Sequence, residues 1–376
     1  MNSKSFLLRV LFGAAGRTIR SAAGSRTRSR AAIAVAVLGG IMVSEDRAWA
    51  QQMPGAAGVV RVYSYREPKL TEGLFAAFQW TTGVKVELIH APSGLVERMV
   101  TEKSSGGADI LLTNDAGLLV MARTEGVTEP LESQILQQAV PPALRDKDGH
   151  WFGLSRNARV ILGSRARVTE EDISYEELAD PKWKGRICMR SGAHAYNAAL
   201  LASLMAHHGP ARAEVWLKGL KANLAQKPEG GDRDQIKRVH DGLCDVAILN
   251  SYYLGAMLAR DATLEQQAWA QSVKVIFPNR GDRGVHVNIS GMALAAKAPN
   301  RDNAVRLMEF LASAMAQQIY ANRNHEYPVN ALGESSPVLR AWGPLKSDDL
   351  PIAEIVARRK DAGSLVQRIL FDAATQ

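Results

Sequence analysis

Short apolar runs rich in β-branched residues alternate along this chain with segments whose apolar residues recur at helical spacing. The first strand is predicted at residues 59–64. A helix should follow, because apolar residues recur every three or four positions between Pro68 and Gly83, which suit its start and its end. Further strands are predicted at 84–89 and 108–112. Strands that alternate with helices build parallel βαβ units, so the sequence predicts an α/β fold.

A second alternating set follows a segment of different character. Residues 151–165 hold two extended runs with little helical pattern, and we expect them to cross from a first lobe into a second. Residues 285–295 should return the chain to the first lobe. Between these crossings we predict strands at 185–190, 246–249 and 273–278, and helices at 196–207 and 232–242.

The predicted fold is therefore α/β with two lobes, each a mostly parallel sheet flanked by helices, joined by crossing strands. We place the first lobe at 51–155, the second at 156–280, and the return to the first lobe with C-terminal helices at 281–376. Two lobes joined in this way form a cleft that can close about a ligand by a hinge motion.

The first 50 residues have the pattern of a targeting segment. Seven basic residues precede an apolar stretch at 31–43 that is too short to span a bilayer comfortably. Ala48-Trp49-Ala50 then supplies a small-x-small cleavage signal, so we predict that 1–50 is a cleaved signal peptide and that the mature chain begins at Gln51. A retained membrane anchor is the alternative.

The basic charge of the chain belongs mostly to this segment. The full sequence has a formal net charge of +8, and the segment contributes eight basic and two acidic residues, so its removal leaves +2. A nearly neutral mature protein gives no argument for binding nucleic acid or an anionic membrane.

Both cysteines, Cys188 and Cys244, adjoin apolar strand-like runs of the second lobe. Two strands of one sheet can bring them together. A disulfide is favoured once the chain is exported to an oxidising compartment. Two buried free thiols are the alternative.

Two adjacent tyrosines follow a predicted strand of the second lobe. Asn250-Ser251 suits a helix N-cap, so Tyr252 and Tyr253 should stand at a strand's carboxyl end, where α/β domains bind ligands. A phenolate is a hard anionic oxygen donor, and a highly charged cation such as ferric iron can displace the phenol proton. Tyr196, with His194 beside it, follows another strand of the same lobe and adds a third phenol. The alternative is that these tyrosines are core or pocket-wall aromatics.

Three residues after the first strand lie in the opposite lobe, across the predicted cleft. Glu67 can supply a carboxylate oxygen, unless it is a solvated surface glutamate. Arg66 can hold a synergistic anion such as carbonate or neutralise clustered phenolates, and the alternative is an ordinary surface arginine. Tyr65 can point into the cleft or pack on the following helix.

The sequence contains no catalytic or nucleotide-binding motif. Its eight histidines form no zinc-binding spacing, and there is no nucleophile elbow, phosphate loop or dinucleotide fingerprint. We therefore expect a binding protein and not an enzyme. Two rivals stay open: a binder of a small organic or inorganic anion, held by Arg66 and helix N-termini, and a secreted hydrolase that uses His194 or Glu67.

Several short motifs, taken together, give the strongest signal in the sequence. They lie at 62–64, 108–113, 115–117, 150–155, 175–186, 250–253 (Asn-Ser-Tyr-Tyr), 286–291 and 324–329 (Asn-His-Glu-Tyr-Pro-Val). With them the chain resembles the periplasmic ferric-iron-binding proteins of bacterial ABC transporters, especially the branch that binds iron mainly through tyrosines. The resemblance covers nearly all of the mature chain up to about Pro344.

This resemblance implies a type II solute-binding fold that holds Fe³⁺ in its cleft as a transported ligand. The family's tyrosine ligands match Tyr196, Tyr252 and Tyr253. Glu67 and Pro68 stand where relatives carry a histidine or a histidine-tyrosine pair. Glu67 can replace the histidine with a carboxylate oxygen, whereas Pro68 has no side-chain ligand, and carbonate or another synergistic anion can complete the shell. The resemblance also implies a periplasmic protein that delivers iron to an inner-membrane ABC permease and its ATPase, and we expect a monomer.

Overall fold

A computed structural model describes residues 58–102 and 106–373. These described residues belong to one compact unit. The signal peptide predicted at 1–50 and the mature start at Gln51 lie outside the described residues and stay predictions.

The elements alternate between strands and helices, as the sequence predicts. The strands are β1 (Val59–Ser64), β2 (Lys85–His90), β3 (Ile110–Thr113), β4 (Phe152–Ser164), β5 (Ile187–Met189), β6 (Val246–Asn250), β7 (Val273–Ile276), β8 (Val287–Leu294) and β9 (Tyr327–Pro328). The helices are α2 (Pro68–Thr82), α3 (Leu95–Thr101), α4 (Ala116–Thr124), α5 (Gln134–Ala139), α6 (Ala195–Ala222), α7 (Asp232–His240), α8 (Ser251–Leu258), α9 (Leu264–Gln271), α10 (Arg301–Ala312), α11 (Ala314–Asn324), α12 (Pro337–Ala341) and α13 (Ile352–Arg368). Short 3₁₀ turns lie at Pro142–Leu144, Glu176–Ala179 and Pro181–Trp183.

Local sequence chemistry sets the ends of the first helix. Pro68 occupies the first turn of α2, where its missing N–H costs no hydrogen bond. Gly83 follows the last turn with a φ of 72°, a conformation that glycine adopts without strain. The chain then enters β2, which pairs in parallel with β1. This is the βαβ unit that the sequence predicts.

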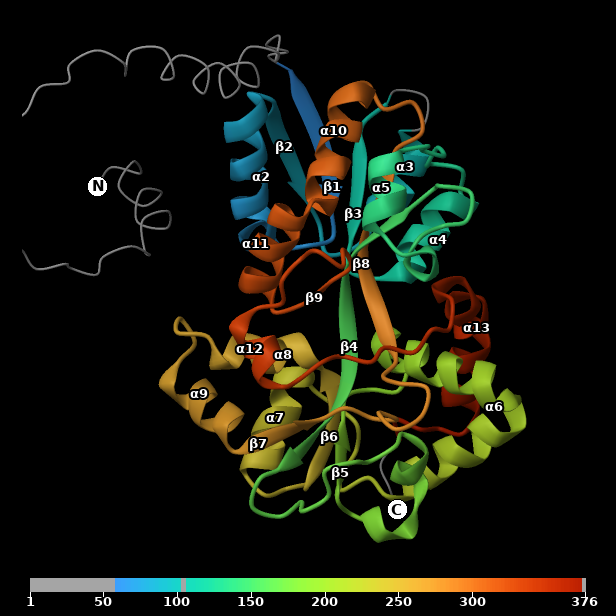
Figure 1. The fold of residues 1–376 in the computed structure, drawn as a ribbon. Helices are drawn as coiled ribbons and strands as arrows, with labels where there is room; N and C mark the ends of the chain where they lie inside the picture. The colour runs from blue at the N-terminus through green and yellow to red at the C-terminus, as the bar shows by residue number, and fades with distance from the viewer. Residues whose placement is uncertain (1–57, 103–105, 374–376) are drawn as a thin grey trace, which may run out of the picture. The chain divides into compact units, whose positions relative to one another are not determined.

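Strand β4 runs through both lobes and links their sheets (Figure 1). Its first part pairs with β8 and β9, and its last part pairs with β6 and β7. The segment predicted at 151–165 to cross between lobes is therefore one long strand. The return predicted at 285–295 is β8, which pairs with both β4 and β3. The two-lobed α/β fold is confirmed.

The sheet is mixed, and here the prediction of mostly parallel lobes needs correction. Its order is β2-β1-β3-β8-β4-β6-β5, with β7 and β9 also paired to β4. The pairs β1–β2, β1–β3 and β5–β6 are parallel, whereas every pair that includes β4 or β8 is antiparallel. The physical reason is that these two strands carry the chain between lobes, so each runs against its neighbours.

Helix α6 extends well beyond the helix predicted at 196–207. Gly209 interrupts it with a φ of 79° and a ψ of 161°, and Pro210 opens a second helical stretch. The predicted helix end at 207 thus lies close to this interruption, whereas the continuation of the helix to Ala222 is not predicted from the sequence. Proline fits this place because the first turn of a helix needs no N–H donor.

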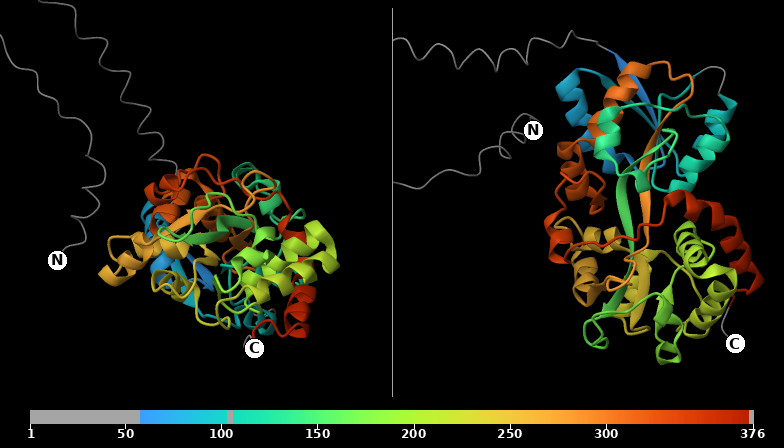
Figure 2. Two further views of the ribbon diagram at one scale, coloured as in Figure 1. Left: turned by 90° about the horizontal axis from the view of Figure 1, so that it is seen from below. Right: turned by 45° about the vertical axis from the view of Figure 1, so that its right-hand side comes forward.

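Helix α13 lies along α6 and also touches α4 (Figure 2). Its Arg359 guanidinium pairs with both carboxylate oxygens of Asp115, the N-cap residue of α4, at 2.7 Å each. The C-terminal helix therefore contacts one helix from each lobe. The residue limits that we assigned to the lobes (51–155, 156–280 and 281–376) stay a prediction.

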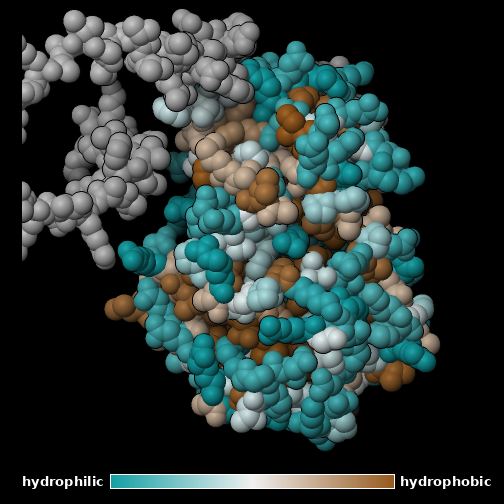
Figure 3. Space-filling model, viewed as in Figure 1, coloured by the Kyte–Doolittle hydropathy of each residue, from teal (hydrophilic) through white to brown (hydrophobic). Residues whose placement is uncertain are grey.

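The face drawn in Figure 3 is mostly hydrophilic, with apolar residues gathered near its middle. Within residues 58–102 and 106–373, no helix has both the length and the apolar character that a membrane crossing requires.

Cys188 and Cys244 form the disulfide that the sequence favours, with Cα atoms 5.8 Å apart. Cys188 lies in β5 and Cys244 lies just before β6. Both are buried in an apolar cluster of the second lobe. The alternative of two free thiols is wrong.

Replacing both cysteines by serine should lower the free energy of unfolding by about 4 kcal/mol, because the bond closes a loop with a sequence separation of 56 residues. Urea unfolding followed by circular dichroism measures this change. Reductant should destabilise the wild type similarly and leave Cys188→Ser/Cys244→Ser unaffected. Equal unfolding midpoints for the oxidised wild type and the variant would contradict a stabilising role.

Candidate functional site

A cavity of about 240 Å³ lies between the two lobes. The β1–α2 loop supplies Tyr65, Arg66 and Glu67 on one side, and the first turns of α6 and α8 supply three tyrosines on the other. The structure therefore brings together the metal-ligand and anion-binding residues that the sequence singles out. The complete lining is Tyr65, Arg66, Glu67, Leu70, Asn114, Tyr196, Arg233, Tyr252, Tyr253, Ala256, Arg323, Asn324 and Glu326.

The three phenols converge from two helices. The hydroxyl oxygens of Tyr196 and Tyr252 lie 3.2 Å apart. The rings of Tyr252 and Tyr253 lie 4.3 Å apart between centroids, with their planes inclined by 34°. Strand β6 leads directly into α8, and β5 leads through a short loop into α6. Since β5 and β6 are parallel neighbours, the first turns of both helices meet at one edge of the sheet.

Burial keeps two of these phenols protonated. It raises the pKa of Tyr252 well above the ordinary value, and the nearby Tyr196 and Tyr253 raise it further. Burial and Tyr253 also raise the pKa of Tyr196. At neutral pH, a cation must therefore displace protons before it can use these phenolate oxygens.

Three guanidinium groups that were not predicted from the sequence lie near the phenol rings. Arg233 lies 5.2 Å from the ring centroid of Tyr253, while Arg190 and Arg159 lie 5.5 and 5.9 Å from that of Tyr196. Positive charge this close favours an anionic oxygen over a neutral phenol. Arg233 could have been found from the sequence, because it lies in the first turn of a helix predicted in the second lobe. The other two become visible only in the tertiary structure.

Arg66 is buried in an ion pair, so the alternative of an ordinary surface arginine is wrong. Its Nη2 lies 2.6 Å from Glu326 Oε1, and its Nη1 donates to Ser290 Oγ at 2.6 Å. Burial alone would lower the pKa of Arg66, but the Glu326 carboxylate, together with Tyr320 and Tyr252, raises it. The other oxygen of Glu326 accepts from Ser290 at 2.9 Å and from Ser155. Glu326 lies in the motif at 324–329, but no local pattern in the sequence indicates a role for its carboxylate.

Glu67 and Tyr65 differ in how they meet the cavity. Glu67 is exposed at the residue before α2, and its side chain makes no capping bond to that helix. Its carboxylate is therefore free of the helix end. Tyr65 borders the cavity, and its hydroxyl accepts the Val96 N–H at 2.9 Å near the start of α3. The structure thus places Tyr65 at the cavity wall, and its hydroxyl bond is to α3 and not to α2, the helix that follows it.

His194 is a helix cap beside the cavity. Its Nδ1 accepts the Tyr196 N–H at 3.3 Å, and the two rings meet edge to face with centroids 4.6 Å apart. Burial, Arg190 and Arg159 lower the pKa of His194 to about 4. A neutral ring whose acceptor nitrogen is engaged with the backbone gives no support to the hydrolase alternative.

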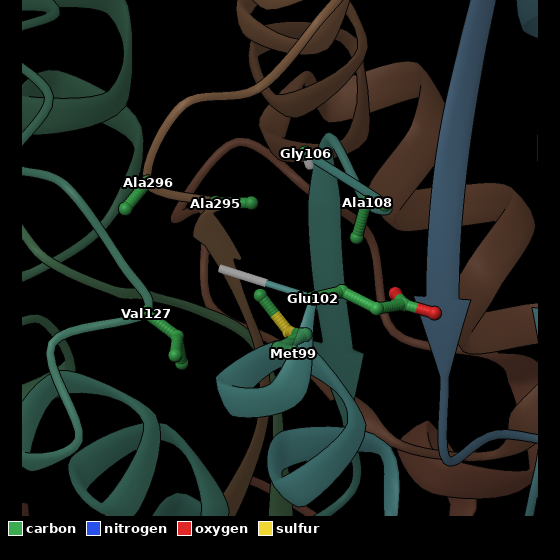
Figure 4. A pocket seen from close by; sticks show the side chains of 8 residues that line it. Met99, Glu102, Gly106, Ala108, Val127, Ala295 and Ala296 are labelled. Carbon is green, nitrogen blue, oxygen red and sulfur yellow. The ribbon is translucent and has the colours of Figure 1, made fainter. Parts of the chain in front are cut away.

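Other places in the described chain offer less chemistry. Residues 58–102 and 106–373 hold no group of three or more His, Cys, Asp and Glu side chains placed to bind a metal ion. A pocket in the first lobe (Figure 4) measures about 10 Å³, room for about one water molecule. A wider hollow beside Glu176 is lined by polar groups that already pair with one another, since Glu176 bonds His208, Asn279 and Arg283.

Sequence comparisons place this chain among bacterial binding proteins. A family model described as "Bacterial extracellular solute-binding protein" matches residues 106–341. The chain is similar to "Iron uptake protein A1" of Synechocystis sp., with 42% identity over 297 residues that cover 78% of this chain and 82% of that protein.

Two solved structures resemble this one over most of their length. The Bordetella ferric binding protein has a TM-score of 0.80 and 44% identity, and the match covers 84% of this chain and 100% of that chain. A Trichodesmium protein solved in complex with iron and citrate ligands has a TM-score of 0.80 and 39% identity, covering 83% of this chain and 99% of that chain.

Replacing Glu326 with glutamine should lower the free energy of unfolding by about 3 kcal/mol, because the buried Arg66 charge would lose its counter-ion. Glu67→Gln removes an exposed carboxylate at the same cavity and should change stability by less than about 0.5 kcal/mol. Urea unfolding of both variants measures the difference. An unfolding midpoint for Glu326→Gln equal to that of Glu67→Gln would contradict a structural role for the pair.

Proposed function

The chain belongs to the bacterial extracellular solute-binding protein family, and on that premise we propose that it captures ferric iron in the cleft between its lobes and delivers it to an inner-membrane ABC permease. The observation that carries this proposal is the meeting of three phenols in one interlobe cavity, with two hydroxyl oxygens 3.2 Å apart. The names of the similar proteins from Synechocystis, Bordetella and Trichodesmium, all of which refer to iron, support it.

Tyr196, Tyr252 and Tyr253 are the proposed iron ligands. Ferric iron is a hard cation, and three phenolate oxygens would balance its charge. Tyr196 and Tyr252 stand in the first turns of their helices, where the positive end of the helix dipole favours an anionic oxygen. Arg159, Arg190 and Arg233 add positive charge around the rings and support the same form.

Glu67 is the proposed ligand from the first lobe. Its exposed carboxylate is hard and lies on the opposite wall of the cavity, so closure of the lobes can bring it to iron held by the tyrosines. Arg66 is already paired with Glu326, so we assign it to the electrostatics of the wall and not to direct capture of the anion. We propose that a carboxylate or carbonate anion completes the shell beside Arg233 and Arg323, which line the cavity and are exposed.

This role is binding and transport without catalysis. Family membership supports a solute-binding protein that works outside the cytoplasmic membrane, which matches the export predicted from residues 1–50. We propose that the periplasmic protein acts as a monomer and that its closed form docks on the permease, whose ATPase drives transport.

Mature protein titrated with ferric citrate should develop a visible ferric–phenolate band that saturates at one equivalent of iron. Tyr252→Phe should lose most of this band. Tyr63→Phe is the matched control, because Tyr63 is a buried tyrosine whose hydroxyl bonds Glu102 at 2.6 Å and which does not line the cavity. It should keep the wild-type band.

Other outcomes of this titration would point away from the proposal. The absence of a band in the wild type, together with no thermal stabilisation by iron, would favour the anion binder that the sequence left open. A band that survives in Tyr252→Phe at full intensity would move the iron site away from the tyrosine pair.

Ferric affinity should fall as the pH falls below neutral. For each phenol proton that iron must displace, the apparent affinity falls about tenfold when the pH drops by one unit. The raised pKa values of Tyr196 and Tyr252 mean that these protons are present and compete at every pH below about 10. Competition with a chelator of known proton linkage measures the slope. Tyr252→Phe should show a slope smaller by about one proton, and a flat profile for the wild type would exclude phenolate ligation.

A further inference from the structure

We infer that Arg159 is a positioning residue of the ferric site: its buried guanidinium holds the three second-lobe segments that present Tyr196, Tyr252 and Arg233 in one fixed arrangement. This inference rests on the proposed function. Arg159 itself does not line the cavity, so apart from the positive charge that it places 5.9 Å from the Tyr196 ring centroid, it acts through its neighbours.

The guanidinium reaches three separate elements of the second lobe. Arg159 is 1% exposed. Its Nη1 donates to Asp232 Oδ2 and to Asn250 Oδ1, each at 3.1 Å. Its Nη2 donates to Asn197 Oδ1 at 2.5 Å and to the Ile248 carbonyl oxygen at 3.2 Å. One side chain thus ties α6, α7 and the β6–α8 junction together.

Each of these partners adjoins a residue of the cavity. Asn197 follows Tyr196 on α6, and Asn250 is the N-cap residue of α8, two positions before Tyr252. Asp232 precedes Arg233, the cation that lies over the Tyr253 ring. A shift of the guanidinium would therefore move both tyrosine-bearing turns relative to each other.

Arg159 is itself held firmly on the crossing strand. It lies opposite Asn250 in the β4–β6 ladder. Its N–H donates to the His286 carbonyl oxygen at 3.0 Å, and its carbonyl oxygen accepts from the Tyr175 hydroxyl. The anchor of the tyrosine segments is therefore the same strand that joins the lobes, which links site geometry to the hinge.

The contacts need a guanidinium and not merely a positive charge. Arginine presents several donors in a planar fork, whereas lysine offers one compact ammonium group that cannot reach three separated acceptors with the same geometry. Arg190 contacts the same carboxylate, with Nη1 3.6 Å from Asp232 Oδ1. Asn197 donates to the Arg190 backbone carbonyl oxygen at 2.9 Å, but in the described part of the chain the Arg190 guanidinium has no hydrogen bond to Asn197 or Asn250. Arg190 therefore does not duplicate the guanidinium contacts of Arg159.

The test compares the ferric titrations of wild type and Arg159→Lys. Lysine keeps the charge opposite Asp232 but loses the fork. We expect ferric affinity to fall about 10- to 100-fold, the usual effect of removing a residue that orients metal ligands. We also expect the visible band to shift and weaken per bound iron, a change that lost folding stability alone would not produce.

Arg167→Lys is the matched control. Arg167 lies in the same lobe, pairs with Asp245 at 2.6 Å and donates to the Val239 and Cys244 carbonyl oxygens, away from the tyrosines. Its variant should keep the wild-type affinity and band. Circular dichroism and thermal unfolding report whether each variant folds.

Asn250→Ala keeps the inference testable if Arg159→Lys does not fold. The Asn250 side chain makes no cap bond to α8, so this change removes one hydrogen bond of the Arg159 guanidinium and leaves the helix cap unaltered. We expect the visible band to shift in the same direction as in Arg159→Lys, with a smaller loss of ferric affinity. If wild type binds iron but folded Arg159→Lys or Asn250→Ala matches it in affinity and band, the inference is wrong. If the wild type itself shows no ferric band, the proposed function fails instead.

Discussion

The hydrogen-bonded ladder of β4 is the constraint on which the rest of this structure depends. The strand pairs with β8 in one lobe and with β6 in the other, so it fixes where the two sheets meet. Because β5 and β6 are parallel neighbours, their carboxyl ends point to the same edge of the sheet, and the helices that follow them begin there. The cavity forms there, and its tyrosines come from the first turns of those helices.

The chemistry of the cavity depends on a balance between burial and charge. Burial raises the pKa of Tyr196 and of Tyr252, so it favours neutral phenols at neutral pH. Neighbouring guanidiniums and helix N-termini favour the anionic form that a ferric ion would use. This balance supports the proposal of a highly charged cation as the ligand, whose binding is expected to weaken in acid.

Local pattern was enough to predict the fold but not the network beneath the site. Strand β1 was predicted at its observed limits, and the two tyrosine-bearing turns were placed correctly, because apolar runs and N-cap residues are local signals. The Arg66–Glu326 pair joins residues 260 positions apart, and nothing near Arg66 identifies its partner. The hydrogen-bond partners of Arg159 are likewise distant from it in the sequence. The mixed sheet was missed for the same reason, since strand direction depends on which strands become neighbours.

The measurement that tests the central claim most directly is diffraction from iron-loaded crystals with data collected on both sides of the iron absorption edge. The account predicts one strong anomalous peak in the interlobe cavity, within bonding distance of the hydroxyl oxygens of Tyr196, Tyr252 and Tyr253. An iron peak within bonding distance of other residues only, or the absence of a peak from the cavity of iron-loaded crystals, would contradict this site.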